Sequence, residues 1–161
     1  MQQRVQQIAE TMQARGWMLA TAESCTGGWV ARELTALAGS SNWFDCGFVT
    51  YSNGAKVRML GVPADLIERE GAVSEEVVRA MAEGAVRCSD AQVAVSISGI
   101  AGPGGGSADK PVGTVWFGWA CKGQPTRAEC HLLDGDREAV RRQAVEIALQ
   151  GILDCQVTGD R

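Results

Sequence analysis

Segments with the periodicity of helices alternate with segments typical of strands along most of the chain, and this alternation is the strongest constraint on the fold. In the helical segments apolar residues recur every three or four positions, as Val5, Ile8 and Met12 do near the N-terminus. Short apolar runs bounded by glycine and polar turn residues indicate strands. Because each element must bury its apolar face against another, the alternation predicts an α/β fold.

Turn and capping residues set the expected boundaries of these elements. The predicted helices cover residues 2–15 and 26–38, two short segments after Gly54 and Pro63, and two longer segments that begin at Ser74 and Asp136. The predicted strands cover residues 17–21, 46–51, 91–98, 113–121 and 126–133. A turn at residues 122–125 joins the last two strands as a hairpin, so the sheet should be mixed. Residues 158–161 are expected to fray.

The composition is that of an ordinary globular protein, with 45% apolar and 21% charged residues. A chain of 161 residues is long enough for one domain with its own core. No apolar run approaches the roughly 20 residues that span a membrane, and the N-terminal MQQRVQQIAE lacks the apolar stretch of a secretion signal. The net charge of -4 argues against a nucleic-acid partner. We therefore expect a cytoplasmic homo-oligomer, a dimer or higher, that binds neither membranes nor nucleic acid.

The cysteines and the histidine give little support to a metal site. The six cysteines are scattered without any C-x-x-C spacing, and His131 is the only histidine. His131 lies in the last predicted strand, where a half-buried structural histidine is expected. We therefore predict no bound metal and expect reduced thiols, as in a cytosolic protein.

A hydroxyl-rich turn, TAESCTGG at residues 21–28, lies between the first predicted strand and the second predicted helix. Ser24 in such a turn can act as a nucleophile. Thr26, Gly27 and Gly28 can hold an anion, because a helix N-terminus offers unpaired N–H groups. A simpler interpretation is also open, in which Thr26 caps the helix and the two glycines only make the turn tight.

A glycine-rich loop, GIAGPGGGSADKP at residues 99–111, follows the third predicted strand. It has no adjacent Gly-Lys-Ser/Thr and is therefore not a P-loop. The spacing of Gly102, Gly104 and Gly106 does not match G-x-G-x-x-G either, so the sequence does not favour Rossmann-type dinucleotide binding. A loop this rich in glycine is not needed for packing, which makes it a candidate for ligand binding.

Ser24, Tyr51 and Lys56 each follow the end of a predicted strand. In an α/β sheet the carboxyl ends of parallel strands gather at one edge, where ligands usually bind. The three side chains are therefore expected at one crevice. A lysine that serves as a base must be neutral, which requires burial to lower its pKa. From the residues alone, Lys56 as a surface lysine and Tyr51 as a ring at the edge of the core remain open.

Five long segments of the chain occur in the order found in a known family: TAESCTGG, GFVTYSNGAK, GAVSEEVV, SISGIAGPGGGSADKPVGTVWF and GDREAVRRQA. The chain resembles the nicotinamide-nucleotide amidases, also called nicotinamide mononucleotide deamidases. These are the stand-alone form of the C-terminal domain of competence/damage-inducible protein A. The resemblance covers residues from about 5 to 153. The larger two-domain relatives carry an additional N-terminal domain, for which this chain is expected to have no room.

The resemblance implies a three-layer α/β/α sandwich with a mixed, mostly parallel five-stranded sheet in which one strand is antiparallel. It implies a single amidase domain over residues 1–161 that hydrolyses nicotinamide mononucleotide to nicotinic acid mononucleotide and ammonia, without a metal or organic cofactor. The serine, tyrosine and lysine of the family fall on Ser24, Tyr51 and Lys56.

The expected mechanism is that of a Ser-Lys amidase. Neutral Lys56 takes the Ser24 proton, directly or through Tyr51, and Ser24 attacks the carboxamide carbon. The developing oxyanion needs backbone N–H donors. The candidate donors lie in two segments, Thr26, Gly27 and Gly28 in the turn and Gly99, Ile100, Ala101 and Gly102 in the glycine-rich loop. Cys25 is the rival nucleophile, because a thiol is intrinsically more reactive.

The predicted C-terminal helix supplies candidate ligands for the substrate's phosphate. Arg137 and Arg141 lie four residues apart and share a face, whereas Arg142 lies about 100° further round the helix. The segment GDREAVR belongs to the segments shared with the family, which favours Arg141 over Arg142. For Arg137 an ordinary solvated arginine is the alternative interpretation.

A second class of function stays open beside the enzyme, namely a non-catalytic module that binds or senses pyridine nucleotides. Such a module needs glycines that hold phosphate, but it has no use for Ser24, Tyr51 and Lys56 at strand ends. The sequence therefore favours the amidase. Release of ammonia from nicotinamide mononucleotide separates the two.

Overall fold

The computed structural model describes residues 1–157, and the fraying predicted for residues 158–161 lies outside this range. The helices are α1 (Gln2–Arg15), α2 (Trp29–Thr35), α3 (Asn53–Leu60), α4 (Ala64–Glu70), α5 (Glu75–Arg87) and α6 (Arg137–Val157), with a 3-10 turn, η1, at Ser40–Asn42. The strands are β1 (Leu19–Glu23), β2 (Phe44–Val49), β3 (Val93–Gly99), β4 (Thr114–Cys121) and β5 (Arg127–Leu132).

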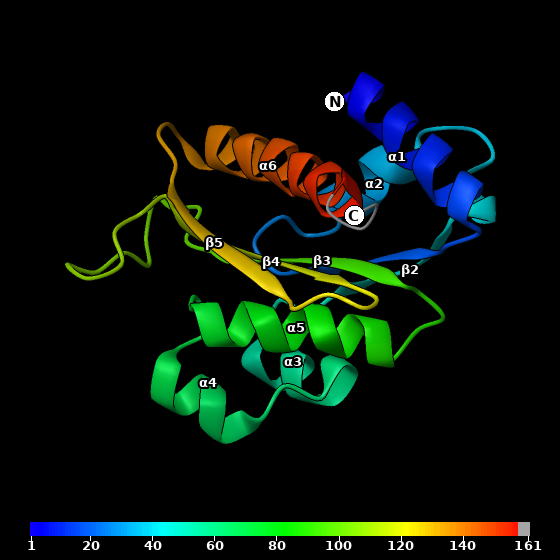
Figure 1. The fold of residues 1–161 in the computed structure, drawn as a ribbon. Coiled ribbons are helices and arrows are strands. Elements are labelled where there is room, and N and C mark those ends of the chain that lie inside the picture. The colour runs from blue at the N-terminus through cyan, green and yellow to red at the C-terminus, as the bar shows by residue number, and fades with distance from the viewer. Residues whose placement is uncertain (158–161) are drawn as a thin grey trace.

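The elements form three layers, with α1, α2 and α6 on one face of the sheet and α3, α4 and α5 on the other (Figure 1). One apolar cluster fills the space between the sheet and the first three helices, where Ile8, Val30 and Leu149 are fully buried. A second cluster fills the opposite side around Leu60 and Met81. The predicted α/β/α sandwich is therefore confirmed.

The strands pair in the order β2-β1-β3-β4-β5. β1 is parallel to both β2 and β3, whereas β4 is antiparallel to β3 and to β5. In the described part of the chain β4 is thus the one strand that runs against the others. This arrangement confirms a mixed, mostly parallel five-stranded sheet, in which the β4–β5 hairpin supplies the antiparallel pairs.

Several elements begin or end at other residues than the sequence predicted, because tertiary contacts and backbone conformation set their ends. β1 continues to Glu23, rather than ending at residue 21, because Ala22 and Glu23 still pair with β2 and β3. The second helix begins at Trp29, not at residue 26, because Gly27 and Gly28 have φ angles of 58° and 98°, which a right-handed helix does not contain. Gly28 is therefore the N-cap, and the expected capping role of Thr26 is wrong.

The predicted capping residues at other helices are confirmed. Gly16 ends α1 in the left-handed conformation, with φ 63°. The Ser74 hydroxyl accepts a hydrogen bond from the Val77 N–H at the start of α5. At the start of α6, Asp136 Oδ1 accepts from the Ala139 N–H at 2.9 Å. None of the helices in residues 1–157 combines the length and the apolar character that a membrane span requires.

Candidate active site

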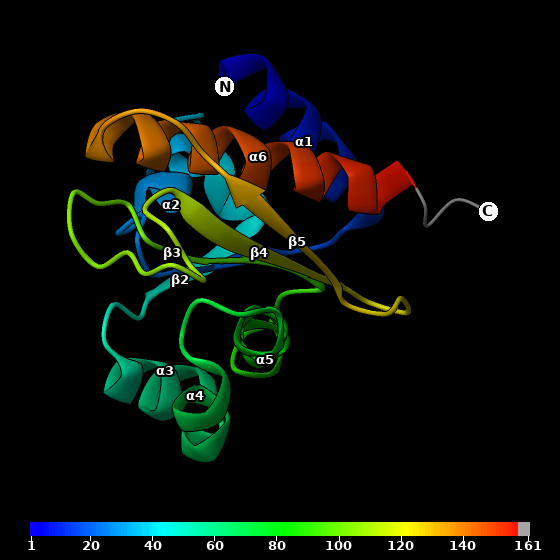
Figure 2. The same ribbon diagram turned by 90° about the vertical axis from the view of Figure 1, so that its left-hand side faces the viewer.

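The ends of the parallel strands β1, β2 and β3 meet at one edge of the sheet, as expected for this type of fold. The loop after β3 and the N-terminal end of α6 lie at the same end of the sheet (Figures 1 and 2). The residues that follow these three strands line a cleft of about 200 Å³. Its lining residues are Ser24, Cys25, Tyr51, Asn53, Lys56, Ala72, Val73, Ser98, Gly99, Ala101 and Arg137.

Ser24 and Lys56 form the floor of this cleft. Ser24 follows β1 directly, and its N–H donates to the Ile97 carbonyl of β3 at 3.0 Å, which ties the residue to the centre of the sheet. Lys56 comes from α3 and is only 1% exposed, and Ser24 is 8% exposed. The Lys56 Nζ lies 3.0 Å from the Ser24 Oγ. The possibility that Lys56 is a surface lysine is therefore wrong.

The surroundings of Lys56 favour its neutral form. Burial away from water lowers the pKa of Lys56 from its ordinary value of 10.5. The Nζ also lies 2.7 Å from the Thr50 carbonyl oxygen and 3.4 Å from the Tyr51 carbonyl oxygen. A neutral amine has two hydrogens for these carbonyls and one lone pair for the Ser24 hydroxyl. Once neutral, Lys56 can therefore keep both carbonyl contacts and still accept the Ser24 proton.

Cys25 is poorly suited to replace Ser24 as the nucleophile. The thiol is 6% exposed, and burial raises its pKa to about 11. A thiol acts as a nucleophile through its thiolate, which is scarce at neutral pH when the pKa is so high. The neighbouring charge of Glu23 raises the pKa further, although burial is the larger cause.

Tyr51 and Arg137 form the mouth of the cleft. Tyr51 follows β2 and is 58% exposed, and Arg137 is the first residue of α6. One guanidinium nitrogen, Nη2, donates to the Tyr51 hydroxyl at 2.8 Å, and the other, Nη1, donates to the Gly102 carbonyl at 2.8 Å. Arg137 therefore joins the loop after β2 to the glycine-rich loop, which the interpretation as a solvated arginine did not anticipate.

The other predicted arginine, Arg141, lies beside the turn rather than in the cleft. Its Nε donates to the Cys25 carbonyl at 3.0 Å, and its Nη2 donates to the Thr26 carbonyl at 3.2 Å. A second hollow of about 270 Å³ is lined by Thr26, Gly27, Gly28, Trp29, Arg32 and Arg141. The structure thus divides the predicted substrate contacts between the cleft and this second hollow.

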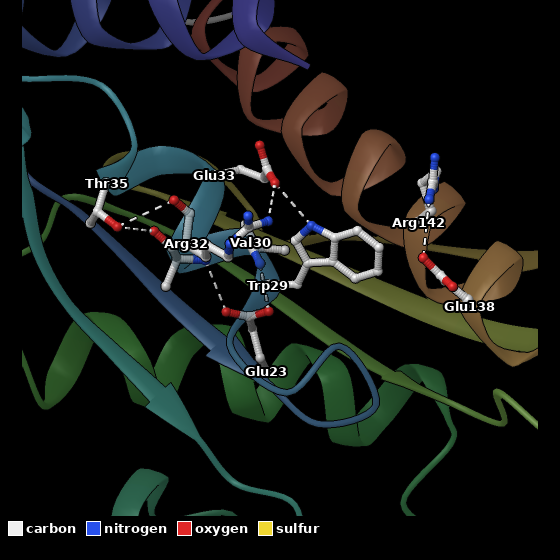
Figure 3. A network of polar contacts seen from close by, with 9 residues as sticks. Glu23, Trp29, Val30, Arg32, Glu33, Thr35, Glu138 and Arg142 are labelled. Carbon is white, nitrogen blue, oxygen red and sulfur yellow. Dashed lines mark hydrogen bonds and ion pairs between the residues drawn. The ribbon is translucent and has the colours of Figure 1, made fainter.

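Arg142 points elsewhere, as its position on the helix predicted. Its Nη2 lies 3.1 Å from the Glu138 carboxylate one helical turn away, and Figure 3 shows this pair on α6, well apart from Glu23 and the start of α2. Arg142 does not line the cleft or the second hollow.

Hydrogen bonds limit which backbone groups can face a substrate. The Gly27 N–H donates to the Ser24 carbonyl at 3.0 Å, and the Ile100 N–H donates to the Thr114 carbonyl at 2.9 Å. These two groups are therefore occupied. Within residues 1–157 the N–H groups of Thr26 and Ala101 make no hydrogen bond, and the N–H of Cys25 contacts only its own thiol. They are the better placed donors near the cleft.

Glu23 is a site-supporting residue that sequence reasoning missed. Its side chain is fully buried between Ser24 and α2, and its carboxylate accepts from the N–H groups of Val30 and Ala31 at 2.9 and 3.1 Å (Figure 3). The Glu23 carbonyl also accepts from the Thr50 N–H at 2.8 Å, and the Thr50 carbonyl contacts Lys56. An acidic residue at a strand end before a short helix was the available signal.

No group of three or more histidine, cysteine, aspartate or glutamate side chains within residues 1–157 is arranged to hold a metal ion. His131 lies on β5, where its ring contacts Glu129 at 3.2 Å and packs edge-on against Phe117. His131 is thus a half-buried residue of the sheet, as predicted.

Fold and cleft together define a class: an α/β/α sandwich with a buried Ser–Lys pair where its parallel strands end. Residues 1–156 match the family described as the CinA C-terminal domain. The chain belongs to this family.

Close relatives and solved structures agree with this membership. The chain is 58% identical over 147 residues to the nicotinamide-nucleotide amidohydrolase PncC of Escherichia coli (strain K12), an alignment that covers 90% of this chain and 88% of the relative. It is 53% identical over 146 residues to the protein of the same name from Pseudomonas putida, with 91% of each chain covered. The crystal structure of the competence/damage inducible protein CihA from Agrobacterium tumefaciens superposes with a TM-score of 0.92 at 42% identity, covering 95% of this chain and 93% of that one.

Proposed function

We propose that this protein is a nicotinamide-nucleotide amidohydrolase that converts nicotinamide mononucleotide and water to nicotinic acid mononucleotide and ammonia. The names of its curated relatives support the activity. The observation that carries the mechanism is the distance of 3.0 Å between Lys56 Nζ and Ser24 Oγ, both at the buried floor of the cleft. In this proposal residues 1–161 belong to one amidase domain, with its core at about 5–153.

In the first half of the reaction Lys56 is the base and Ser24 is the nucleophile. Neutral Lys56 takes the hydroxyl proton directly, because its Nζ already lies within hydrogen-bond distance of the Ser24 Oγ. The Oγ forms a bond to the carboxamide carbon, and the carbonyl oxygen becomes an oxyanion. When the C–N bond breaks, Lys56 returns the proton to the nitrogen, which leaves as ammonia.

In the second half water hydrolyses the ester on Ser24. Lys56, neutral again, takes a proton from water, and the resulting hydroxide attacks the acyl carbon. The bond to the Ser24 Oγ breaks and the proton returns from Lys56 to this oxygen. The product leaves with a carboxylate in place of the carboxamide, and the reaction needs neither a metal nor an organic cofactor.

Backbone N–H groups at the cleft stabilise the oxyanion in this proposal. The N–H of Cys25, the residue after the nucleophile, and the N–H of Thr26 come from the turn, and the N–H of Ala101 comes from the opposite loop. None of the three donates to another described residue, and each belongs to a residue that lines the cleft or the second hollow. Preorganised donors of this type account for a large share of the rate in many hydrolases.

The other residues predicted to contact the substrate are divided between the cleft and the second hollow. Of the predicted loop residues, Gly99 and Ala101 line the cleft, Gly102 accepts a hydrogen bond from Arg137 at the mouth, and Ile100 does not line the cleft. Thr26, Gly27 and Gly28 line the second hollow. We assign Arg141 to the support of this turn, because two of its donors already hold turn carbonyls. The second hollow remains an outer contact surface for the substrate.

The reaction belongs in the cytoplasm in this proposal, since within residues 1–157 none of the six cysteines forms a disulfide. A homo-oligomer, a dimer or higher, remains the assembly we propose. Sedimentation of the purified protein measures it, and a monomer at all concentrations would contradict it.

The decisive experiment mixes the purified protein with nicotinamide mononucleotide and measures ammonia. We expect many molecules of ammonia per molecule of protein, together with nicotinic acid mononucleotide. Binding of one nucleotide per chain without any ammonia would instead support a pyridine-nucleotide-sensing module.

A further inference from the structure

The mouth of the cleft contains a solvent-exposed hydroxyl, that of Tyr51, whose proton has no acceptor among residues 1–157. The Tyr51 hydroxyl oxygen accepts a hydrogen bond from Arg137 Nη2 at 2.8 Å. Its own proton has no acceptor within residues 1–157, and the side chain is 58% exposed. A phenol held by a guanidinium in this way offers its proton to whatever occupies the mouth.

Tyr51 is poorly placed to carry the proton between Ser24 and Lys56. These two residues already lie 3.0 Å apart, so no intermediary is needed. Tyr51 meets Lys56 through its backbone carbonyl at 3.4 Å, whereas its hydroxyl is engaged by Arg137 at the mouth. The phenol therefore belongs to recognition rather than to proton transfer.

The shape of the cleft decides which end of the substrate reaches the mouth. Ser24 is 8% exposed at the floor, so the carboxamide must enter first to bring its carbon to the Oγ. A cleft of about 200 Å³ holds the pyridine ring and part of the ribose, and the phosphate must extend outward. Among the described residues that line the cleft, Arg137 is the one arginine and Lys56 the one lysine, and burial lowers the pKa of Lys56.

We propose that Tyr51 determines specificity for the nucleotide: its hydroxyl donates to the phosphate monoester that Arg137 binds at the mouth of the cleft. Arg137 keeps its Nε and two further hydrogens for the phosphate after its bonds to Tyr51 and Gly102. The Tyr51 hydroxyl and the Arg137 guanidinium are in direct contact, so both can donate to the same phosphate. Hydrogen bonds to a charged phosphate are stronger than those between neutral groups. The inference rests on the proposed amidase function and assigns to Tyr51 the discrimination between the nucleotide and the riboside.

The competing place for the phosphate is the second hollow beside Arg141. There the guanidinium already holds the carbonyls of Cys25 and Thr26. The neighbouring turn has no free hydroxyl that faces solvent, because the Thr26 Oγ1 is completely buried. The mouth formed by Tyr51 and Arg137 therefore offers more free donors than the second hollow.

The test is Tyr51→Phe, assayed on nicotinamide mononucleotide and on the dephosphorylated riboside. Loss of one hydrogen bond to a charged group predicts a KM for the nucleotide that is raised about tenfold to a hundredfold. The kcat for the nucleotide and both constants for the riboside should stay within about twofold of the wild type, since the riboside has no phosphate to lose. Arg142→Ala is the matched control, because it removes an arginine of α6 outside the cleft. It should leave kcat and KM unchanged for both substrates.

A second measurement keeps the test decisive where the riboside reacts slowly. In the Ser24→Ala background, titration calorimetry with the nucleotide should show the same tenfold to hundredfold loss of affinity on adding Tyr51→Phe. A fall in kcat with both substrates would make Tyr51 a proton carrier and overturn the inference, and an unchanged KM and affinity would overturn it as well. A wild-type protein that releases no ammonia from the nucleotide would refute the amidase instead, which is a distinct result.

Discussion

The floor and the mouth of the cleft differ most in their contact with water. At the floor Lys56 is 1% exposed and Ser24 is 8% exposed, whereas at the mouth Tyr51 is 58% exposed. Burial lowers the pKa of Lys56, which in the proposed mechanism favours the neutral amine that acts as the base. At the mouth the exposed guanidinium of Arg137 donates to the Tyr51 hydroxyl and to the Gly102 carbonyl.

If the proposed roles hold, the contrast means that this fold places the chemistry at the buried floor and the recognition of substrate at the exposed mouth. A buried lysine without a carboxylate partner costs stability but gains reactivity, because only the neutral amine accepts a proton. An exposed arginine and phenol cost little folding stability, because they stay hydrated. A phosphate can replace the water that hydrates them. Changes at the floor should therefore act on kcat, and changes at the mouth should act on KM.

The largest effect is expected from removal of the nucleophile at the floor. Ser24→Ala deletes one oxygen from a turn, so kcat for ammonia release should fall by about a thousandfold or more, while circular dichroism and thermal unfolding stay unchanged. Cys25→Ala is the neighbouring control and should lose far less, because burial raises the pKa of this thiol to about 11. High turnover by Ser24→Ala with loss of turnover by Cys25→Ala would move the nucleophile to Cys25.

The next effect tests whether Lys56 acts as a base or only as a charge. Arginine keeps a positive charge but does not release a proton near neutral pH. Lys56→Arg should therefore lower kcat by about a hundredfold or more, nearly as much as Lys56→Ala. Steady-state ammonia release measures both variants. If Lys56→Arg retained most of the activity, Lys56 would be an electrostatic contact and the floor would lack its base.

The pH dependence should separate the floor from the mouth. Below the lowered pKa of Lys56 the amine is protonated, so kcat/KM should rise about tenfold per pH unit and level off above this pKa. Rates measured from about pH 5 to 9 report the position of this rise. Tyr51→Phe should leave it in place. A rate independent of pH over this range would contradict a titrating lysine.

The two arginines of α6 should differ in the constant that they change. Arg137→Ala removes a donor at the mouth and should raise KM for the nucleotide by about tenfold or more, with little effect on the riboside. Arg141→Ala removes the bonds to Cys25 and Thr26 and should lower kcat for both substrates by about tenfold. Losses by Arg141→Ala that are confined to the nucleotide would restore Arg141 as a phosphate ligand, as the sequence first predicted.

The smallest effect concerns stability. Lys56→Met keeps the length of the side chain and removes the cost of burying an amine, so the melting temperature should rise by about 2–8 °C at neutral pH. Because folding lowers the pKa of Lys56, the unfolded chain binds more protons and wild-type stability rises with pH up to about 10.5. The advantage of Lys56→Met should therefore shrink as the pH rises. A variant less stable than the wild type would show that the contacts of Lys56 outweigh its burial.

Much of the fold followed from local patterns. The stripe of Val5, Ile8, Ala9 and Met12 predicted a buried helix face, and all four residues are buried in α1. Turn residues between alternating elements predicted the mixed α/β sheet. The rule that parallel strands end at one edge brought Ser24, Tyr51 and Lys56 to one cleft, where the structure places them, while their catalytic roles stay predictions.

Other features had no local signal. β3 contains two serines, Ser96 and Ser98, yet six of its seven residues are buried because helices cover both faces of the sheet. Phe44 and Asp45 begin β2 before the predicted start at residue 46, because pairing with β1 extends it. The strand ends were therefore set by their neighbours and not by their own residues.

The amino-acid sequence by itself determined the order and type of the elements and the small set of residues able to do chemistry, because periodicity and turn residues act over a few positions. Only the tertiary structure decided that Lys56 is buried against Ser24, that the Glu23 carboxylate accepts from N–H groups in the first turn of α2, and that Arg137 donates to the Tyr51 hydroxyl. The last pair is 86 residues apart in the chain. Such contacts depend on strand order and on how the helices pack across the sheet, and burial at the resulting cleft is what lowers the pKa of Lys56.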